Sequence, residues 1–167
     1  MFPPECVAAA EWLLAACRQR GLMLVTAESC TGGLIAGCLT EIAGSSAVVD
    51  RGLVTYSNKA KEELLGVRAD SLRSHGAVSE RVAREMAEGA LQRSSAGLSL
   101  AVTGIAGPDG GTPEKPVGLV HLAAASTGRT LHQRAQFHGD RQAIRLATVR
   151  AALDLGAKLL AGSSDLA

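Results

Sequence analysis

The chain has 167 residues, a formal net charge of +1, 47% hydrophobic residues and only 2% aromatic residues. This length and composition predict one globular domain over residues 1–167, with an aliphatic core and no need for disulfides or a structural metal. Acidic and basic residues are interleaved, which excludes the continuous positive face that a nucleic-acid backbone requires, so we expect no nucleic-acid partner.

The first part of the chain is predicted to form a helix, a strand and a second helix. Two prolines suit a first helical turn and apolar residues follow at helical spacing, which predicts a helix over residues 4–20. The apolar run of residues 22–26 predicts a buried strand whose end is at residues 27–29. The second helix is expected to begin near residues 31–33 and to end near Ile42.

The middle of the chain is predicted to add two strands and two helices. Residues 48–56 are rich in Val and Leu and predict a strand, and Asn58 is expected to cap a helix over residues 59–65. Ser79 is expected to open another helix, and residues 98–103 predict a short strand. The buried face of that helix is predicted to carry Val82, Ala83, Met86, Ala87 and Ala90.

The last part of the chain begins with a glycine-rich loop, residues 104–113. Two strand-like segments follow, residues 117–125 and 129–137, and their short link predicts a β-hairpin. From Asp140 the apolar residues return to helical spacing, which predicts a long amphipathic C-terminal helix. Its apolar positions are Ile144, Thr148, Ala151, Leu155 and Leu159.

This alternation of strands and helices predicts an α/β fold. We expect a mixed, mostly parallel sheet covered by helices on both faces, with an antiparallel hairpin and a long helix at the C-terminal end. Ligands of such sheets bind at the loops that leave the strands. Two polar segments, residues 26–33 and the glycine-rich loop, are predicted to be such loops.

Cysteine usage and the lack of targeting signals predict a cytoplasmic protein. The four cysteines form no C-x-x-C pair and are expected to be reduced. The N-terminus resembles no signal peptide and no run of about 18 apolar residues occurs, so we expect neither export nor a membrane partner. His, Cys, Asp and Glu show no ligand spacing, which predicts no metal and no other cofactor.

Ser29 is a candidate nucleophile. It leaves a predicted strand just before two glycines, where a serine hydroxyl can lie beside unpaired backbone N–H groups that stabilise an oxyanion. The alternative is that Ser29 caps the following helix. Cys30 is a second candidate nucleophile, but no histidine partner for a thiolate is evident nearby.

A serine nucleophile needs a base, and the four histidines lie in no partner motif, so a lysine is considered. Lys61 lies in the first turn of its predicted helix, where the helix dipole disfavours an ammonium group. Lys59 is the competitor, but two residues along a helix correspond to about 200° of rotation, so only one of the two can face the serine. The alternative is that both are solvated surface residues. Tyr56 either packs in the core or relays a proton between serine and lysine.

The glycine-rich loop is a candidate anion-binding site, because glycines let backbone N–H groups approach a phosphate. The candidates for substrate binding here are Thr103, Gly104, Ala106 and Gly107. A long surface turn is the alternative, since the loop matches neither a P-loop nor a dinucleotide fingerprint. Arg141 could add a charged contact to phosphate, or be solvated or paired with an aspartate.

The chain resembles the CinA C-terminal domain family over nearly its whole length. The similarity lies in ordered blocks at residues 26–33, 44–46, 51–52, 56–61, 76–79, 104–111 and 115–118. The resemblance implies hydrolysis of the carboxamide of nicotinamide mononucleotide to nicotinic acid mononucleotide and ammonia, in pyridine-nucleotide salvage and without a metal. It also implies that the substrate is a small nucleotide.

The resemblance assigns roles to the matching residues. It implies Ser29 as the nucleophile, Lys61 as the general base and Tyr56 as a helper. The oxyanion and the phosphate would be held by the glycine-rich loop together with Thr31, Gly32 and Gly33. Two alternatives stay open: a non-catalytic nucleotide-binding or regulatory module of the same family, and an amidase for another small amide. A homo-oligomer is compatible with the apolar terminal helices.

Overall fold

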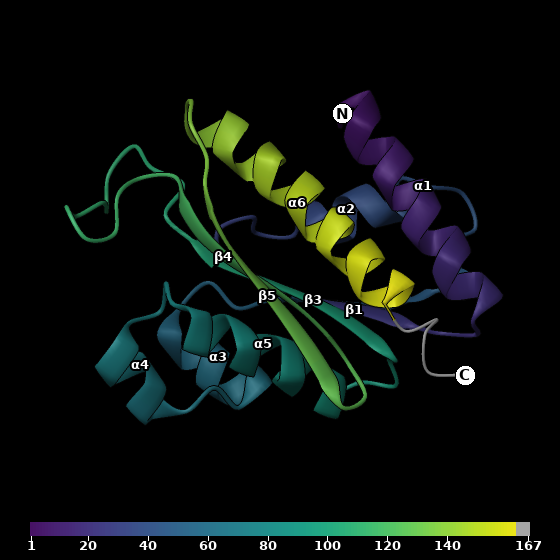
Figure 1. Ribbon diagram of the computed structural model, residues 1–167, viewed down its shortest axis with the longest axis horizontal. Helices are drawn as coiled ribbons and strands as arrows, with labels where there is room; N and C mark the ends of the chain where they lie inside the picture. Colours follow the sequence, from purple (N-terminus) through teal and green to yellow (C-terminus); the bar gives the residue numbers. More distant parts are fainter. Residues whose placement is uncertain (163–167) are drawn as a thin grey trace.

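A computed structural model describes residues 1–162 and shows one five-stranded mixed sheet (Figure 1). The strands are β1 (Leu24–Glu28), β2 (Val49–Val54), β3 (Leu98–Gly104), β4 (Leu119–Ser126) and β5 (Arg129–Gln136). Their spatial order is β2-β1-β3-β4-β5, in which β2, β1 and β3 run parallel, while β4 and β5 are antiparallel to their neighbours. The sheet therefore has a parallel core and an antiparallel end.

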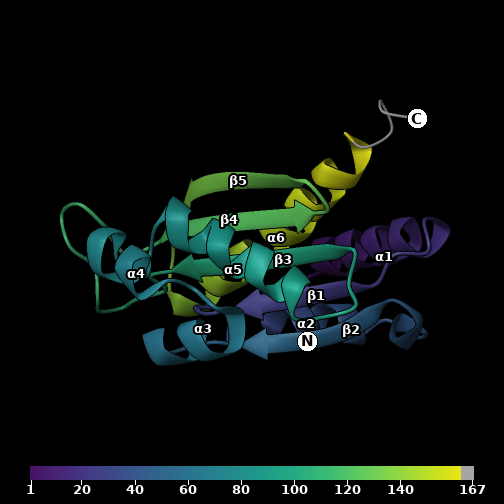
Figure 2. The same cartoon turned by 90° about the horizontal axis from the view of Figure 1, so that it is seen from below.

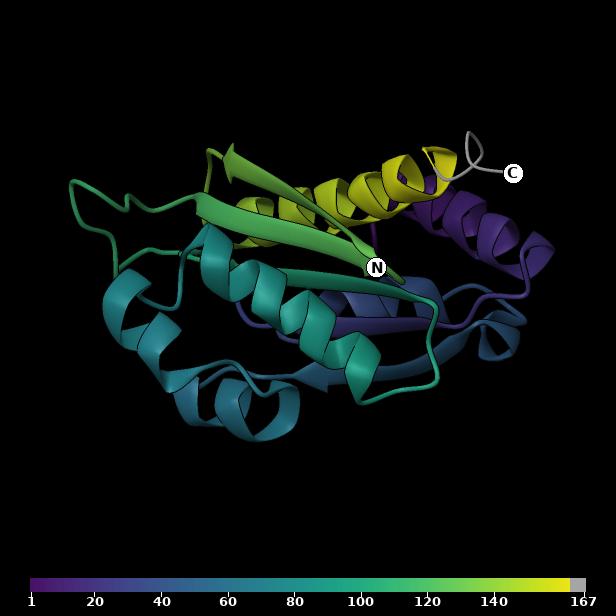
Figure 3. The ribbon, with the colours of Figure 1, turned by 60° about the horizontal axis from the view of Figure 1, so that its bottom comes forward.

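Helices cover both faces of this sheet, as Figures 1 and 2 show from two directions. One face carries α2 (Leu34–Thr40) and α6 (Arg141–Ala161), with α1 (Pro4–Gln19) packed outside them. The other face carries α5 (Glu80–Gln92), and α3 (Asn58–Leu65) and α4 (Ala69–His75) pack beside it (Figure 3). A short 3₁₀ helix, η1 (Ser45–Ala47), precedes β2.

The core consists of two apolar layers of different character. The layer under α1, α2 and α6 contains large aliphatic residues such as Leu100, Leu122 and Leu153. The layer under α5 is rich in alanine. The helices α3 and α5 approach each other so closely that a Cβ at Gly89 of α5 would lie 1.8 Å from the carbonyl oxygen of Leu65 in α3. Small residues thus allow the close helix packing that a core with few aromatic residues requires.

The predicted fold class is confirmed, and most elements lie within a few residues of their predicted positions. The prediction that Asn58 caps α3 is wrong, because the cap is Ser57, whose hydroxyl accepts a hydrogen bond from the N–H of Ala60. The helix α4 was not predicted. In α6 the buried surface is wider than one stripe, since α1 covers its outer side, and residues such as Val149 and Leu160 are also buried. The predicted domain includes residues 163–167, which lie outside the described residues.

Parallel pairing places the loops that matter at one edge of the sheet. Because β1 and β3 are adjacent and parallel, their carboxyl ends bring residues 29–33 and the glycine-rich loop together. The end of β2 adds residues 55–57 beside them. Among residues 1–162, no helix is long and apolar enough to cross a membrane, and no His, Cys, Asp and Glu cluster could hold a metal ion.

Candidate active site

A cavity of about 300 Å³ lies at this edge of the sheet. Its volume is at the lower end of the range typical of small-molecule sites. The predicted site residues that line it are Ser29, Tyr56, Lys61, Thr103, Gly104, Ala106, Gly107 and Arg141. The lining excludes Thr31, Gly32 and Gly33, which were predicted to bind substrate. Eight predicted residues from five separate segments therefore meet around one space.

Ser29 and Lys61 are in direct hydrogen-bond contact inside this cavity. The Nζ of Lys61 lies 3.0 Å from the Oγ of Ser29 and donates a second hydrogen bond to the Thr55 carbonyl oxygen at 2.8 Å. Only 1% of the Lys61 surface is exposed, so its amine is shielded from solvent. The distance between the serine oxygen and the amine is within the range required for proton transfer.

The environment of Lys61 favours an uncharged amine. Burial lowers the pKa of Lys61 below its ordinary value. Within the described part of the chain, no carboxylate lies within ion-pair distance of its Nζ. Lys59 differs completely, because its side chain is 83% exposed and pairs with Glu63 one turn later. Of the two lysines that the sequence left in competition, only Lys61 faces the serine.

Cys30 also lines the cavity, but its thiol is poorly suited to attack. Burial raises the pKa of the Cys30 thiol to about 11, which leaves almost no thiolate near neutral pH. The side chain is 6% exposed. The geometry therefore favours the hydroxyl of Ser29 over the thiol of Cys30 as nucleophile.

Residues 29–33, which we call the serine turn, are held from the inside by Glu28. The Glu28 carboxylate is fully buried and accepts hydrogen bonds from the N–H groups of Gly33, Ile35 and Ala36 at the start of α2. It also accepts hydrogen bonds from the hydroxyls of Thr26 and Thr31. A negative charge at a helix N-terminus is favourable because it binds the unpaired N–H groups there.

This use of Glu28 changes what residues 31–33 can do. The Thr31 hydroxyl lies 2.6 Å from the Glu28 Oε2 and the Gly33 N–H donates to the same oxygen at 3.1 Å. The Gly32 N–H donates to the Ser29 carbonyl oxygen and closes the turn. The Thr31 hydroxyl and the N–H groups of Gly32 and Gly33 are therefore engaged inside the protein, and these three residues lie outside the cavity lining.

A residue that the sequence analysis did not single out, Arg145, holds the serine turn from the other side. Its Nε donates to the Cys30 carbonyl oxygen at 3.1 Å and its Nη2 donates to the Thr31 carbonyl oxygen at 2.7 Å. No sequence pattern pointed to this contact, because it joins α6 to a turn more than 100 residues earlier. The glutamate was visible inside the 26–33 block, but its burial was not predictable.

The glycine-rich loop forms the opposite wall of the cavity. Within residues 1–162, the N–H groups of Ala106 and Gly107 have no hydrogen-bond acceptor. Gly107 has a φ of +75°, which a residue with a side chain rarely adopts, and a Cβ there would lie 2.6 Å from Val117. The loop thus contains unpaired backbone donors on two residues that line the cavity, as an anion site requires.

Tyr56 and Arg141 form a polar pair at the cavity mouth. The Nη2 of Arg141 donates to the Tyr56 hydroxyl at 2.9 Å, and its Nη1 donates to the Gly107 carbonyl oxygen at 2.6 Å. Tyr56 is 61% exposed, so it is not a core residue. Because Ser29 and Lys61 are already in contact, no hydroxyl is needed between them to relay a proton.

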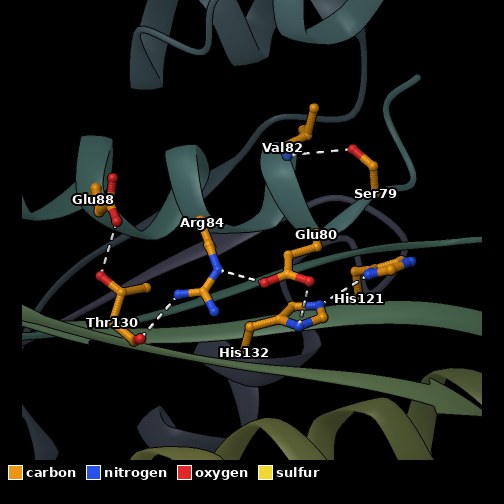
Figure 4. A network of polar contacts seen from close by, with 8 residues as sticks. All are labelled: Ser79, Glu80, Val82, Arg84, Glu88, His121, Thr130 and His132. Atoms are coloured by element: carbon orange, nitrogen blue, oxygen red, sulfur yellow. Dashed lines mark hydrogen bonds and ion pairs between the residues drawn. The ribbon is translucent and has the colours of Figure 1, made fainter. Parts of the chain in front are cut away.

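Two of the histidines that looked scattered in the sequence, His121 on β4 and His132 on β5, lie side by side (Figure 4). The Nδ1 of His121 lies 2.9 Å from the Nε2 of His132, and the Nδ1 of His132 lies 3.4 Å from Glu80. His121 is paired across the sheet with Thr103, which lines the cavity. Burial lowers the pKa of His121 to about 4, so the ring is neutral at pH 7. The pair links β4 and β5 to the start of α5.

A larger hollow of about 640 Å³ lies elsewhere, between α5 and the turn that joins β4 to β5. Its lining combines Arg84, Glu88 and Arg129 with the backbone of the turn, and it contains no nucleophile beside a base. Size alone favours that hollow, but chemistry favours the smaller cavity with Ser29 and Lys61. We therefore take the smaller cavity as the candidate active site.

Comparison with solved structures confirms the fold. A competence/damage inducible protein, CihA, from Agrobacterium tumefaciens superposes with a TM-score of 0.93 at 55% identity, covering 96% of this chain and 98% of that one. A CinA superfamily protein from Escherichia coli superposes with a TM-score of 0.83 at 37% identity, covering 93% and 88% of the two chains.

Sequence comparison places the chain in a family. It is 50% identical over 146 residues to the nicotinamide-nucleotide amidohydrolase PncC of Escherichia coli K12, covering 87% of this chain and 88% of that protein. A putative competence-damage inducible protein of Symbiobacterium thermophilum is 52% identical over 156 residues, but this chain spans only 37% of its length. The model of the CinA C-terminal domain matches residues 7–160. The chain belongs to the CinA C-terminal domain family.

Proposed function

We propose that this protein hydrolyses the carboxamide of nicotinamide mononucleotide to nicotinic acid mononucleotide and ammonia, with Ser29 as nucleophile and Lys61 as general base. Two relatives named nicotinamide-nucleotide amidohydrolase support the substrate, because they are 50% and 56% identical over most of both chains. The observation that carries the chemistry is the buried Lys61 amine, 3.0 Å from the Ser29 oxygen, inside a cavity. The product would enter pyridine-nucleotide salvage.

In the first half-reaction the Ser29 oxygen attacks the carboxamide carbon. The hydroxyl proton passes to the neutral Lys61 amine, and the carbonyl oxygen becomes an oxyanion in a tetrahedral intermediate. The carbon–nitrogen bond then breaks, and the Lys61 ammonium donates its proton to the departing nitrogen, which leaves as ammonia. The nicotinate group is left as an ester on Ser29, and Lys61 is again neutral.

In the second half-reaction water attacks the ester carbon. Lys61 takes a proton from that water, the bond between the carbon and the Ser29 oxygen breaks, and Lys61 returns the proton to the serine. The acid product leaves with the hydroxyl group of the water. Because Lys61 accepts and returns a proton in each half, its lowered pKa serves both steps.

The glycine-rich loop is assigned to the oxyanion. The N–H groups of Ala106 and Gly107 have no acceptor within the described residues and belong to residues that line the same cavity as Ser29. Backbone donors that are fixed before the reaction stabilise the negative charge that develops on the carbonyl oxygen. In the serine turn, the N–H groups of Gly32 and Gly33 already bind Ser29 and Glu28, whereas those of Cys30 and Thr31 have no acceptor within residues 1–162 and can add to the same oxyanion site.

Arg141 and Tyr56 are assigned to the nucleotide phosphate. Arg141 lines the cavity at its mouth, where a phosphate attached to the ribose would remain near solvent. A guanidinium group binds phosphate through two parallel hydrogen bonds, and the Tyr56 hydroxyl beside it can add a third.

The test is ammonia release from nicotinamide mononucleotide by the wild type and four variants. We expect Ser29→Ala and Lys61→Ala to lose activity by about 10³-fold or more. Cys30→Ala and Lys59→Ala should keep most of it, because the Cys30 thiol is protonated and Lys59 faces solvent. Activity that survives in Ser29→Ala but not in Cys30→Ala would overturn the assignment of Ser29 as the nucleophile.

The same assay separates the two alternatives. A nucleotide sensor would bind nicotinamide mononucleotide and release no ammonia. An amidase for another small amide would hydrolyse free nicotinamide as fast as the nucleotide. We expect the nucleotide to react faster, because binding energy from the remote phosphate contributes to the rate.

The pH dependence follows from Lys61. The folded protein holds the pKa of Lys61 below its ordinary value, so the amine becomes an active base at a lower pH than a solvated lysine would. We expect kcat/KM to rise with pH as Lys61 loses its proton and then to level off. If kcat/KM instead decreased as the pH increased over the same range, a protonated Lys61 would be required.

A further inference from the structure

We infer that Arg145 is a positioning residue for the nucleophile, an inference that rests on the proposed role of Ser29. Arg145 lies on α6, and its guanidinium group donates to the carbonyl oxygens of Cys30 and Thr31, the two residues that follow Ser29. Arg145 does not line the catalytic cavity. Its effect on the reaction must therefore pass through the backbone of the serine turn.

The two hydrogen bonds fix the orientation of consecutive peptide planes. In a trans peptide the C=O and the following N–H point in opposite directions, so holding a carbonyl oxygen also sets the direction of the next N–H. Arg145 holds the Cys30 and Thr31 carbonyls, and the next N–H after Thr31 is that of Gly32. That N–H donates to the Ser29 carbonyl oxygen and closes the turn around the nucleophile.

The serine turn is thus held between an anion and a cation. Glu28 binds the N–H groups on the α2 side, and Arg145 binds the carbonyl oxygens on the α6 side. The guanidinium approaches the backbone closely, since a Cβ at Gly32 would lie 3.4 Å from its Nη2. Among the described residues, Arg145 has no carboxylate partner, and both of its side-chain hydrogen bonds are made to the turn.

One helix therefore serves two different needs of the site. Arg141 and Arg145 are four residues apart on α6 and so lie on one face. Arg141 lines the cavity and reaches Tyr56 and Gly107, while Arg145 reaches the serine turn. Loss of Arg141 should weaken substrate binding, whereas loss of Arg145 should let the Ser29 oxygen move relative to Lys61.

A small displacement of the nucleophile has a large kinetic effect, since a misplacement of about 1 Å can reduce the rate about 100-fold. We expect Arg145→Gln to lower kcat about 30-fold and to change KM less than threefold. Arg145→Lys keeps the charge but cannot make both hydrogen bonds in the same planar geometry, so its kcat should lie between those of Arg145→Gln and the wild type.

The experiment compares these variants with Arg150→Gln, a control on the same helix. Arg150 pairs with Asp154 and donates to the Glu5 carbonyl oxygen, away from the cavity. For each protein we would measure the melting temperature, kcat and KM for ammonia release, and the rate at which a fluorophosphonate labels Ser29. The labelling needs no nucleotide, so it tests the positioning of Ser29 separately from the proposed substrate.

Positioning by Arg145 predicts slower labelling and lower kcat per folded molecule in both Arg145 variants, with Arg150→Gln like the wild type. A purely structural role predicts a lower melting temperature with unchanged kcat and labelling in the folded fraction, which would overturn the inference. A rise in KM alone would assign Arg145 to substrate binding and would also overturn the inference.

The wild type separates this inference from the proposed function. If the wild type is labelled at Ser29 but releases no ammonia, the proposed substrate is rejected and the labelling comparison still tests Arg145. If the wild type is not labelled at Ser29, both the proposed nucleophile and the inference about Arg145 are rejected.

Discussion

The two loops at the edge of the sheet both contain glycines and were both candidate binding loops, but they differ in how their backbones are used. In the serine turn, the N–H groups of Gly32 and Gly33 bind Ser29 and Glu28, and Arg145 holds two of its carbonyl oxygens. In the glycine-rich loop, the N–H groups of Ala106 and Gly107 have no acceptor within residues 1–162.

This difference suggests a division of labour between the loops. A nucleophile must be fixed relative to its base, and the hydrogen bonds of Glu28 and Arg145 hold the serine turn from inside the protein. An oxyanion or a phosphate needs donors that are still unpaired when the substrate arrives. Glycine permits both arrangements, so its presence alone does not tell which one a loop adopts.

The largest expected effect tests the fixed side of this comparison. Lys61→Met keeps the length of the side chain but removes the base, so kcat/KM should fall about 10³-fold, equivalent to about 4 kcal/mol. Ammonia release measures this loss, and thermal unfolding shows that the variant is folded at the assay temperature. Full activity in Lys61→Met would disprove the role of this lysine.

The next largest effect concerns the support of the serine turn. Glu28→Gln replaces one carboxylate oxygen by an amide nitrogen that cannot accept, so at least one backbone N–H at the start of α2 loses its acceptor. We expect the free energy of unfolding to fall by about 3 kcal/mol. Chemical denaturation measures this, with Glu63→Gln as control, since Glu63 makes only an exposed ion pair and should change stability by less than about 0.5 kcal/mol.

A smaller effect is expected from the histidine pair behind Thr103, at the base of the glycine-rich loop. Burial, with the positive charges of His132, Arg134 and Lys115, lowers the pKa of His121 to about 4, although Glu80 opposes this. The unfolded chain therefore binds a proton between about pH 6.5 and pH 4 that the folded protein does not. The stability from this group is complete above pH 6.5 and is lost as the pH falls toward 4.

The measurement is the free energy of unfolding from pH 7.5 to pH 4.5. We expect the wild type to lose on the order of 2 kcal/mol through this group across that range. In His121→Phe, which carries no titrating ring at this position, the loss should be correspondingly smaller. Equal slopes for the two proteins would mean that His121 takes up its proton in the folded state as readily as in the unfolded chain.

The smallest expected effect tests the receptive side of the comparison. Arg141→Gln should raise KM for nicotinamide mononucleotide about tenfold, equivalent to about 1.4 kcal/mol, because a charged contact to the phosphate is lost. Its kcat should change much less, since Arg141 does not touch Ser29 or Lys61. Steady-state kinetics test this. A fall in kcat with unchanged KM would place Arg141 in the chemical step instead.

Sequence alone determined the elements and the chemical candidates of this protein. Hydrophobic periodicity and caps are local signals, and they predicted α5 with its buried face, the hairpin of β4 and β5, and the long α6. The motif around Ser29 and the pair of lysines on α3 supplied a nucleophile and two possible bases. The helix α4 was missed because Leu72 is its only large buried apolar residue, so the segment shows no helical period.

Only the tertiary structure decided which candidates act together. Burial of Lys61 and exposure of Lys59 depend on α3 packing against α5 with Lys61 turned toward Ser29, which local sequence does not encode. Glu28, Arg145 and the histidine pair acquire partners through contacts between segments far apart in the chain. Whether a backbone donor is paired depends on its neighbours in space. For this reason the sequence alone could not distinguish the roles of the two glycine-containing loops.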